Sequence, residues 1–250
     1  MKKRTLLLPL LLLLIFPSYA WKTVPSTEVI VNTSTEASFE EYSTNLYNSI
    51  DEKELDFTAF ESALKGYLTL ASTQQIDNSK YLSIIDFSKS SSEERLFIID
   101  IKAKKLVQKS LVAHGRNSGL EYASRFSNKV QSFQSSIGFY KTAETYIGKH
   151  GFSLRLDGLE YSNNNARSRA IVIHGADYAS KKFVTQNGRL GRSLGCPSLP
   201  KKIHKEIINM IKDGTCLFIY YPKEAYLQKS KLLNSNTSTL AANLDTSMLN

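Results

Sequence analysis

The chain has 250 residues, 42% of them hydrophobic, with 32 Lys and Arg against 23 Asp and Glu, which gives a formal charge of +9. This length suits one globular domain with appendages, and 12 Phe and 13 Tyr supply a core that excludes a mainly disordered chain. The composition also excludes collagen, coiled-coil and disulfide-scaffold proteins. Basic residues scattered without aromatic neighbours argue against a nucleic-acid partner.

Residues 1–20 are typical of a signal peptide. A positive start at residues 2–4 is followed by an apolar run over residues 5–16, and small Ser18 and Ala20 precede the expected cleavage site. The run is shorter than the roughly 20 apolar residues that cross a bilayer, and an uncleaved anchor is the alternative. We therefore expect an exported protein of the periplasm or cell envelope, with no stable membrane span after cleavage.

Residues 21–56 are expected to form a flexible lead that ends in a helix. Its first part is rich in Ser, Thr and Glu and has no apolar periodicity. A helix is predicted over residues 39–50, because Ser38 and Glu41 match a capping box and apolar residues recur on one face. A second helix is predicted to follow Asp56 as its N-cap.

The segment 57–221 is predicted to be the folded domain, and its pattern is mainly β. Six runs of aliphatic and β-branched residues read as strands: residues 81–87, 96–101, 106–114, 153–159, 170–174 and 215–221. One more helix is predicted over residues 201–213, which follow Pro200 and precede Gly214. Residues 222–250 become rich in Ser, Thr and Asn, which predicts a disordered tail.

A histidine and a cysteine are the strongest chemical signal. His174 ends a predicted buried strand, and Cys196 lies on a turn beside Gly195 and Ser193. An imidazole within hydrogen-bonding distance of a thiol produces a thiolate beside an imidazolium, and such a thiolate attacks acyl carbonyls. Gly195 lets the backbone approach a substrate, and the N–H groups of Gly195 and Cys196 can point at a developing oxyanion. Taken alone, one Cys and one His far apart in sequence leave a structural role open.

The second cysteine, Cys216, lies in the apolar and aromatic run from Thr215 to Tyr221. A thiol in a buried strand behaves as a small inert hydrophobe. Two cysteines in an exported chain also allow one disulfide, so a bond between Cys196 and Cys216 stays open as the alternative.

The pattern His174-Gly175, then seventeen residues, then Ser193-x-Gly195-Cys196 resembles the signature of the L,D-transpeptidase (YkuD-like) catalytic domain. Further blocks resemble the murein L,D-transpeptidase branch of that family: residues 112–119, 126–128, 135–140, 156–160 and 188–193. The resemblance extends over residues 57–221 and implies an L,D-transpeptidase-like β-sandwich, with a short N-terminal helical segment and one helix after the catalytic cysteine.

The resemblance implies cysteine-dependent acyl transfer on peptidoglycan stem peptides, without a cofactor. The Cys196 thiolate would attack the L-centre carbonyl of diaminopimelate in a tetrapeptide stem and expel D-Ala. An amine of a second stem would then take the acyl group and form a 3-3 cross-link, with His174 as acid and base. Water as the acceptor would give an L,D-carboxypeptidase, and attack on an existing cross-link an endopeptidase.

This chain departs from the wider family's pattern at two positions. Many members carry a His before the Gly-Cys pair, where this chain has Leu194, and an Arg or Asn two residues after the cysteine, where it has Ser198. Arg192 and Arg189 are the nearest cations before Cys196 and are candidates to hold the substrate in place of that residue. A solvated loop charge is the competing interpretation for both arginines.

His114 and Gly175 are the remaining substrate-binding candidates. His114 ends a strand before Gly115, as His174 does before Gly175, so it either lines the cleft or hydrogen-bonds its loop. His114, His174 and Cys196 have the ligand types for zinc. No Cys-x-x-Cys or His-x-x-x-His pair accompanies them, so we expect no metal.

Two other functions remain to be weighed against acyl transfer on murein. A non-catalytic murein-binding envelope protein would keep the scaffold, but the intact Cys196 and His174 argue against it. A cysteine peptidase acting on protein would use the same two residues in the same roles and differ in its substrate.

Overall fold

A computed structural model describes residues 33–235 of the chain, with side chains from residue 39 onward. The predicted signal peptide over residues 1–20, most of the flexible lead and the end of the predicted tail lie outside the described residues. Within residues 33–235, no helix combines the length and the apolar character needed to cross a membrane.

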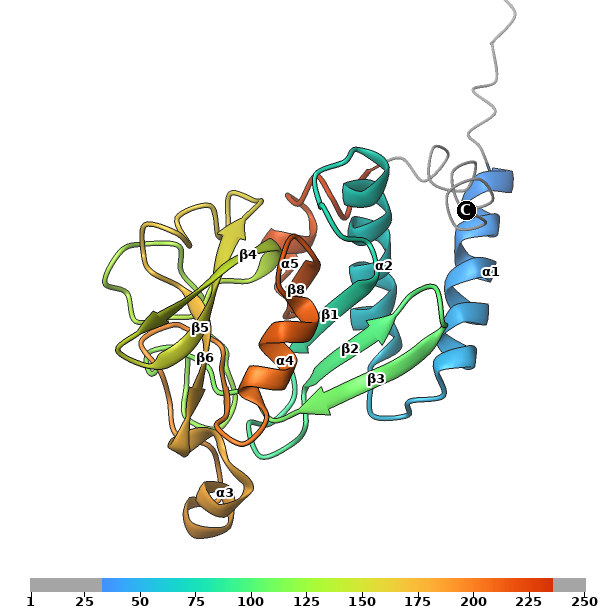
Figure 1. The fold of residues 1–250 in the computed structure, drawn as a ribbon. Helices are drawn as coiled ribbons and strands as arrows, with labels where there is room; N and C mark the ends of the chain where they lie inside the picture. The colour runs from blue at the N-terminus through green and yellow to red at the C-terminus, as the bar shows by residue number, and fades with distance from the viewer. Residues whose placement is uncertain (1–32, 236–250) are drawn as a thin grey trace, which may run out of the picture. The chain divides into compact units, whose positions relative to one another are not determined.

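Two helices begin the described chain, six strands follow, and shorter helices then flank the last two strands (Figure 1). The helices are α1 (Thr33–Ile50), α2 (Phe57–Ser72), the short 3-10 helix η1 (Asp177–Ala179), α3 (Lys181–Asn187), α4 (His204–Ile211) and α5 (Glu224–Leu227). The strands are β1 (Tyr81–Asp86), β2 (Leu96–Asp100), β3 (Lys105–Ser110), β4 (Gly138–Gly148), β5 (Gly151–Gly158), β6 (Val172–Ala176), β7 (Ser198–Pro200) and β8 (Cys216–Tyr220).

The strands of the described residues form one eight-stranded sheet in the order β3-β2-β1-β8-β4-β5-β6-β7. The pairs β1–β8 and β6–β7 are parallel and the other neighbours are antiparallel. Figure 1 shows β1 to β3 on one side of β8 and β4 to β6 on the other. The predicted mainly β fold is therefore confirmed, and β8, which joins the two sides, is buried along its whole length.

Two strands have no counterpart in the sequence-based prediction. β4 mixes glycine, lysine and glutamate with aromatic residues, so it lacks a sustained apolar run, and β7 has only three residues and ends in proline. Both are strands because they pair with neighbours distant in sequence: β4 with β5 and β8, and β7 with β6. β-structure of this kind depends on partners rather than on local propensity.

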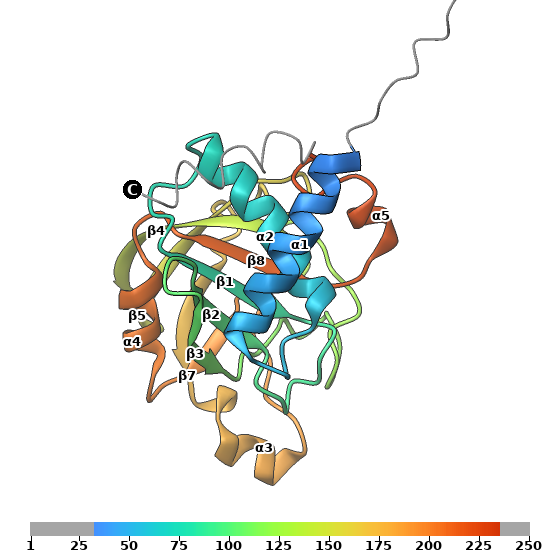
Figure 2. The ribbon, with the colours of Figure 1, turned by 90° about the vertical axis from the view of Figure 1, so that its right-hand side faces the viewer.

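Helix α2 covers the sheet over β1 and β8, and α1 packs against α2 and contacts β3. α2 begins where predicted, because the carboxylate of Asp56 accepts the Ala59 backbone N–H at 2.9 Å. α1 begins at Thr33, so Ser38 lies inside the helix and not at its N-cap as predicted. Figure 2 shows α1 and α2 side by side over the strands, and α2 contacts both β1 and β8.

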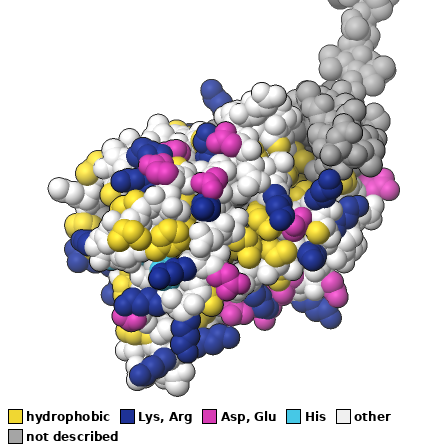
Figure 3. Space-filling model, in the orientation of Figure 1, with side chains coloured by type: hydrophobic (Ala, Val, Ile, Leu, Met, Phe, Trp, Pro, Cys, Tyr) yellow, Lys and Arg dark blue, Asp and Glu magenta, His cyan; other side chains and the backbone are white. Residues whose placement is uncertain are grey.

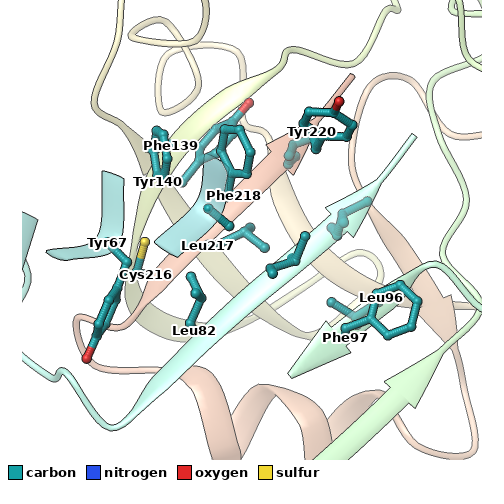
Figure 4. Close-up of a cluster of buried hydrophobic side chains, with 14 of the residues drawn as sticks. Tyr67, Leu82, Leu96, Phe97, Phe139, Tyr140, Cys216, Leu217, Phe218 and Tyr220 are labelled. Atoms are coloured by element: carbon teal, nitrogen blue, oxygen red, sulfur yellow. The ribbon is translucent and has the colours of Figure 1, made fainter. Parts of the chain in front are cut away.

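The core lies between α2 and the centre of the sheet. Figure 4 shows Phe139 of β4 and Phe218 of β8 within it, and their rings stack with centroids 4.1 Å apart. Cys216 lies in the same cluster near Tyr67 of α2 and is fully buried, as predicted for an inert thiol. Each large apolar side chain buried here contributes about 1.5–3 kcal/mol to folding, so this cluster anchors the strands that carry the site.

The chain after β8 differs from the predicted tail that starts at residue 222. The buried carboxylate of Glu160 accepts hydrogen bonds from the hydroxyls of Tyr226, at 2.6 Å, and Ser230, and from the backbone N–H of Phe139 at 2.9 Å. Residues 222–235 are therefore packed against the domain. The composition of the segment concealed this, because its anchor is a carboxylate more than 60 residues away in the sequence.

Candidate active site

The turn that carries Cys196 lies between two other segments of the chain. β7 follows the turn and runs parallel to β6, with Ser198 opposite His174. On the other side, isolated bridges pair Ala113 with Ser198 and Gly115 with Ser193. The cysteine turn is thus held at both ends against backbone that is distant in sequence.

Ser193 and Gly195 determine the shape of this turn. The Ser193 hydroxyl donates to the carbonyl of Cys196 at 2.6 Å and accepts the N–H of Gly195 at 3.1 Å. Gly195 has φ +123°, and a Cβ there would lie 2.9 Å from the Gln134 carbonyl oxygen, so only glycine fits without strain.

The expected pair of oxyanion donors is reduced to one. The Gly195 N–H is already bonded to Ser193, contrary to the prediction that it points at an oxyanion. Among the described residues, no hydrogen-bond acceptor is found for the Cys196 backbone N–H. That N–H is therefore the donor at the turn that can still bind an oxyanion.

The Cys196 side chain is half-buried and lies against the start of β6. Its thiol donates to the Ala170 carbonyl at 3.6 Å, and its sulfur accepts the Val172 N–H at 3.5 Å. Burial raises the pKa of the Cys196 thiol, while the Val172 N–H and the charge of Arg169 act in the opposite direction. The free protein therefore holds a thiol and not the thiolate expected from a neighbouring imidazole.

His174 is buried and held in one tautomer. Its Nδ1–H donates to the Gly175 carbonyl at 3.1 Å, so Nε2 carries the lone pair and accepts the Ser198 hydroxyl at 2.9 Å. Burial lowers the pKa of His174 to about 4, so the ring is neutral at pH 7. Among the described residues, no hydrogen bond joins His174 to the Cys196 sulfur, and Nε2 of His174 is bonded to Ser198 instead.

Two more histidines and a tyrosine surround His174. The exposed ring of His150 stacks on His174, with centroids 4.2 Å apart, and the Tyr178 hydroxyl bonds Ser198 at 3.0 Å. His204 packs against Gly175, where a Cβ would lie only 2.7 Å from the His204 ring. At the candidate Gly175, the carbonyl binds Nδ1 of His174, and the missing side chain leaves room for the His204 ring.

The candidate His114 is fully buried among protein groups. Its Nδ1 accepts from the Arg95 guanidinium at 2.8 Å, and its Nε2–H faces the Gly119 carbonyl at 3.4 Å. Burial, with the charge of Arg95, lowers the pKa of His114 to about 3. Of the two interpretations offered by the sequence, the contacts fit the one in which His114 hydrogen-bonds its loop.

The two candidate arginines, which lie near Cys196 in sequence, donate hydrogen bonds to backbone carbonyls. Arg192 donates to the carbonyls of Arg116 and Gly119 at 3.0 and 3.1 Å, and Arg189 donates to the Leu190 carbonyl at 2.8 Å. These contacts leave the candidates Arg192 and Arg189 at the edge of the cysteine turn. The cation whose charge acts on the Cys196 thiol most strongly is Arg169, which carried no signal in the sequence.

Both cysteines are free thiols, so the alternative of a disulfide between them is not realised. In the part of the chain that the structure describes, no group of three or more His, Cys, Asp or Glu side chains is arranged to hold a metal ion.

A separate pocket of about 800 Å³ opens beside α3, where β6 and β7 end. Lys181, Lys182, Lys201 and Lys202 are among its lining residues. Only two of these four form an ion pair among the described residues, Lys181 with Glu94 and Lys201 with Asp177. Figure 3 shows basic side chains gathered over this end of the molecule. The surface beside the ends of β6 and β7 is therefore cationic.

Comparison with known proteins gives one match that covers most of the domain. The family described as the L,D-transpeptidase catalytic domain matches residues 51–220. No curated protein sequence matches the chain.

Solved structures with similar folds are distant in sequence. An L,D-transpeptidase from Mycobacterium smegmatis aligns at 11% identity over 57% of this chain and 59% of its own, with TM-score 0.36. L,D-transpeptidase 1 of Mycobacterium tuberculosis aligns at 9% identity over 57% and 62%, with TM-score 0.33. The L,D-transpeptidase of Stackebrandtia nassauensis aligns at 9% identity over 76% and 90%, with TM-score 0.35. The chain thus spans about three fifths of the mycobacterial proteins.

Proposed function

Because the chain belongs to the L,D-transpeptidase catalytic domain family, we propose that it transfers acyl groups between peptidoglycan stem peptides through Cys196. The family match supports a peptidoglycan transpeptidase activity. The observation that carries the assignment to Cys196 is the half-buried thiol on a glycine turn, beside its own backbone N–H and the strand of His174. A cationic pocket at the end of that strand suits an anionic wall polymer.

The first half-reaction forms a thioester. The sulfur of Cys196 bonds to the L-centre carbonyl carbon of diaminopimelate, and the bond from that carbon to the terminal D-Ala nitrogen breaks. The thiol proton passes to Nε2 of His174 and from there to the leaving amine. The Cys196 N–H donates to the carbonyl oxygen as it gains negative charge, and losing one such donor typically costs about 3–4 kcal/mol of transition-state stabilisation.

His174 has the right tautomer for this role, because the Gly175 carbonyl fixes the lone pair on Nε2. For proton transfer, Nε2 must exchange the Ser198 hydroxyl for the thiol of Cys196. Catalytic hydrogen bonds are often poorly aligned in the free enzyme and tighten in the substrate complex. A thiolate formed beside His174 also stabilises the imidazolium, and so offsets the low pKa that burial imposes.

The second half-reaction depends on the acceptor. The amine of a second stem, deprotonated by His174, attacks the thioester and gives a 3-3 cross-link, and Cys196 recovers its proton. Water in the same position releases a tripeptide stem, and attack on an existing cross-link opens it. We further propose that residues 1–20 export the chain to the periplasm or cell envelope and that residues 57–221 form the catalytic domain.

Mass spectrometry of purified tetrapeptide muropeptides tests the proposal. The chain from residue 21 to 250 should produce 3-3 dimers or lose D-Ala, while Cys196→Ala and Cys196→Ser should lose nearly all turnover, since an alkoxide is much harder to form than a thiolate. Cys216→Ala is the matched control, because Cys216 lies in the core at β8, and it should retain the activity.

The alternatives give different results in the same assay. A folded wild-type protein that binds muropeptides and leaves them unchanged would contradict acyl transfer and favour a murein-binding protein. Cleavage of casein without any change in the muropeptides would favour a cysteine peptidase. Activity of Cys196→Ser close to wild type would refute the nucleophile.

A further inference from the structure

Arg169 lies directly before β6 and binds a loop that is distant in sequence. Its Nη1 donates to the Ser127 carbonyl at 2.8 Å and to the Ser136 hydroxyl at 2.5 Å. Its Nη2 donates to the Gln134 carbonyl at 2.6 Å and to the Ser132 hydroxyl at 3.2 Å. One guanidinium therefore ties together the loop over residues 127–136.

The same loop supports the cysteine turn. The Ser135 hydroxyl donates to the Gly195 carbonyl at 3.2 Å and accepts the Gly115 N–H at 3.0 Å. A Cβ on Gly195 would lie 2.9 Å from the Gln134 carbonyl and 3.4 Å from Nη2 of Arg169. The loop thus contacts the residue before Cys196 directly, and the guanidinium lies next to the space that a side chain at Gly195 would fill.

The charge of Arg169 is not neutralised by a carboxylate. No ion pair includes Arg169 among the described residues, and its four acceptors are carbonyls and hydroxyls. Arg167, two residues upstream, differs in this respect, because it pairs with Glu144 and Asp157 on the exposed surface. Arg169 is half-buried, so solvent screens its charge less than that of Arg167.

We propose that Arg169 is a positioning residue of this site, which holds the loop over residues 127–136 against the cysteine turn and supplies an unneutralised cation that favours the thiolate of Cys196. This role rests on the proposed function of Cys196. The two groups also affect each other. The charge of Arg169 lowers the pKa of the Cys196 thiol, and the charge of the Cys196 thiolate raises the pKa of Arg169. Arg192 and Arg189, nearer in sequence, use their donors on other carbonyls.

The test measures the pKa of the Cys196 thiol from the pH dependence of its alkylation by iodoacetamide, followed from pH 7 to a pH above the raised pKa of the thiol. Peptide mass mapping separates Cys196 from the buried Cys216. A nearby cation typically lowers the pKa of an acid by about 1–3 units. Arg169→Gln, which keeps part of the hydrogen bonding and loses the charge, should therefore raise the thiol pKa by about 1 unit. Alkylation at pH 7 should slow about tenfold.

Two variants separate charge from structure. Arg169→Lys keeps the cation but not the planar fork, so its thiol pKa should stay near wild type while its turnover falls. Arg167→Ala removes a neighbouring arginine that contacts neither loop nor turn, and should leave the thiol pKa unchanged. Melting curves establish that each variant is folded.

The proposal is overturned if folded Arg169→Gln has the thiol pKa of wild type, or if Arg169→Lys shifts it as far as Arg169→Gln does. If Arg169→Gln fails to fold, Arg169→Met takes its place, and its thiol pKa is compared with the thiol pKa of wild type and of Arg169→Lys. Alkylation does not require muropeptide turnover. A wild type that is inactive on stems would therefore refute the proposed function and leave the result for Arg169 readable.

Discussion

Ser198 occupies the position on His174 that the proposed chemistry requires for the thiol. Its hydroxyl donates to Nε2 of His174 and bonds the Tyr178 hydroxyl, so the three side chains form a buried chain of hydrogen bonds. A hydrogen bond donated to the lone pair stabilises the neutral ring and lowers its pKa. A hydroxyl that donates to Nε2 thus favours the neutral ring, in the same direction as burial, and it must leave Nε2 before the thiol can bind there.

Replacing Ser198 by alanine should raise the pKa of His174. A neutral hydrogen bond contributes about 1 kcal/mol, which corresponds to about 0.7 pKa unit, so the acidic limb of activity should move upward by that amount. NMR titration of the imidazole measures the shift. Tyr178→Phe should give a smaller rise, because it removes only the outer hydrogen bond, and Ser168→Ala, on the exposed surface, should give none.

A His174 pKa in Ser198→Ala equal to that of wild type would mean that the Ser198 hydroxyl does not contribute to the value. The stacked His150 ring would then be the next group to change, since its charge is a smaller cause of the lowered pKa of His174.

The sequence predicted Cys196 and His174 as the candidate chemical residues but did not predict the residues that contact them. Cys196 and His174 stand out because a thiol and an imidazole have distinct chemistry at the ends of recognisable patterns. Ser198, Tyr178 and Arg169 are ordinary residue types, and their importance follows from the register that pairs β6 with β7 and from a loop 35 residues upstream of Arg169. Arg192 and Arg189 were chosen by distance along the chain, which is a poor guide to distance in space.

At the level of elements, residues 222–235, which follow β8, stabilise the sheet by packing on Glu160. Glu160, just after β5, accepts from the backbone of Phe139 in β4 and from two side chains of residues 222–235. Its carboxylate therefore joins β4, the loop after β5 and α5. Burial and the neighbouring Glu160 charge raise the pKa of Tyr226, so this hydroxyl remains a donor at every physiological pH.

Removing residues 222–250 should destabilise the domain far more than removing residues 236–250. The longer truncation leaves the buried Glu160 carboxylate without two donors, and an unsatisfied charged group costs about 1–3 kcal/mol or more. Urea unfolding followed by circular dichroism measures the difference between chains that end at 221 and at 235. Equal stability of the two chains would contradict a stabilising role of residues 222–235.

The point variant Tyr226→Phe tests the same contact without truncation. It removes only the hydroxyl that reaches Glu160 at 2.6 Å, and we expect a loss of about 1–3 kcal/mol. Tyr161→Phe is the matched control, because the Tyr161 ring is exposed and its hydroxyl bonds the Ala225 carbonyl at 3.2 Å. That variant should unfold at nearly the wild-type urea concentration.

For the whole molecule, buried neutral histidines make folding sensitive to mild acid. The pKa of His174 falls from 6.5 to about 4 and that of His114 to about 3, mainly through burial. Around His114 the charges of Arg95, Arg192 and Arg189 act in the same direction, and around His174 those of His150 and His204 do. Between pH 6.5 and about 4, the unfolded chain therefore binds protons that the folded chain does not.

Stability should accordingly fall as the pH is lowered from 7 to 5. Each of the two histidines is expected to cost about 2 kcal/mol over this range. Asp86 partly offsets the loss, because burial raises the pKa of its carboxyl and protonation then favours the folded state. Urea unfolding at pH 7, 6 and 5 measures the free energy of unfolding at each pH.

The matched variant for this measurement is His114→Gln, which keeps an acceptor for Arg95 and a donor for Gly119 but does not titrate. It should lose about half of the pH dependence. A wild-type protein with the same unfolding free energy at pH 5 and pH 7 would show that these histidines titrate normally in the folded state.

Sequence alone determined the features of this protein that are local or periodic. The mainly β pattern, the Asp56 cap of α2, the buried run around Cys216 and the chemistry of Cys196 and His174 all depend on residue type and short spacing. Such features are set by neighbours along the chain, where the physical chemistry of each residue acts directly.

Only the tertiary structure decided which side chains and backbone groups contact one another in the site. Pairing of β6 with β7 places Ser198 beside His174, and the fold brings the charge of Arg169 to the cysteine turn, while Arg192 binds other carbonyls. The packing of residues 222–235 on Glu160 belongs to the same class. Each is a contact between residues far apart in the chain, and a one-residue change of register between β6 and β7 would replace the pairing of His174 with Ser198.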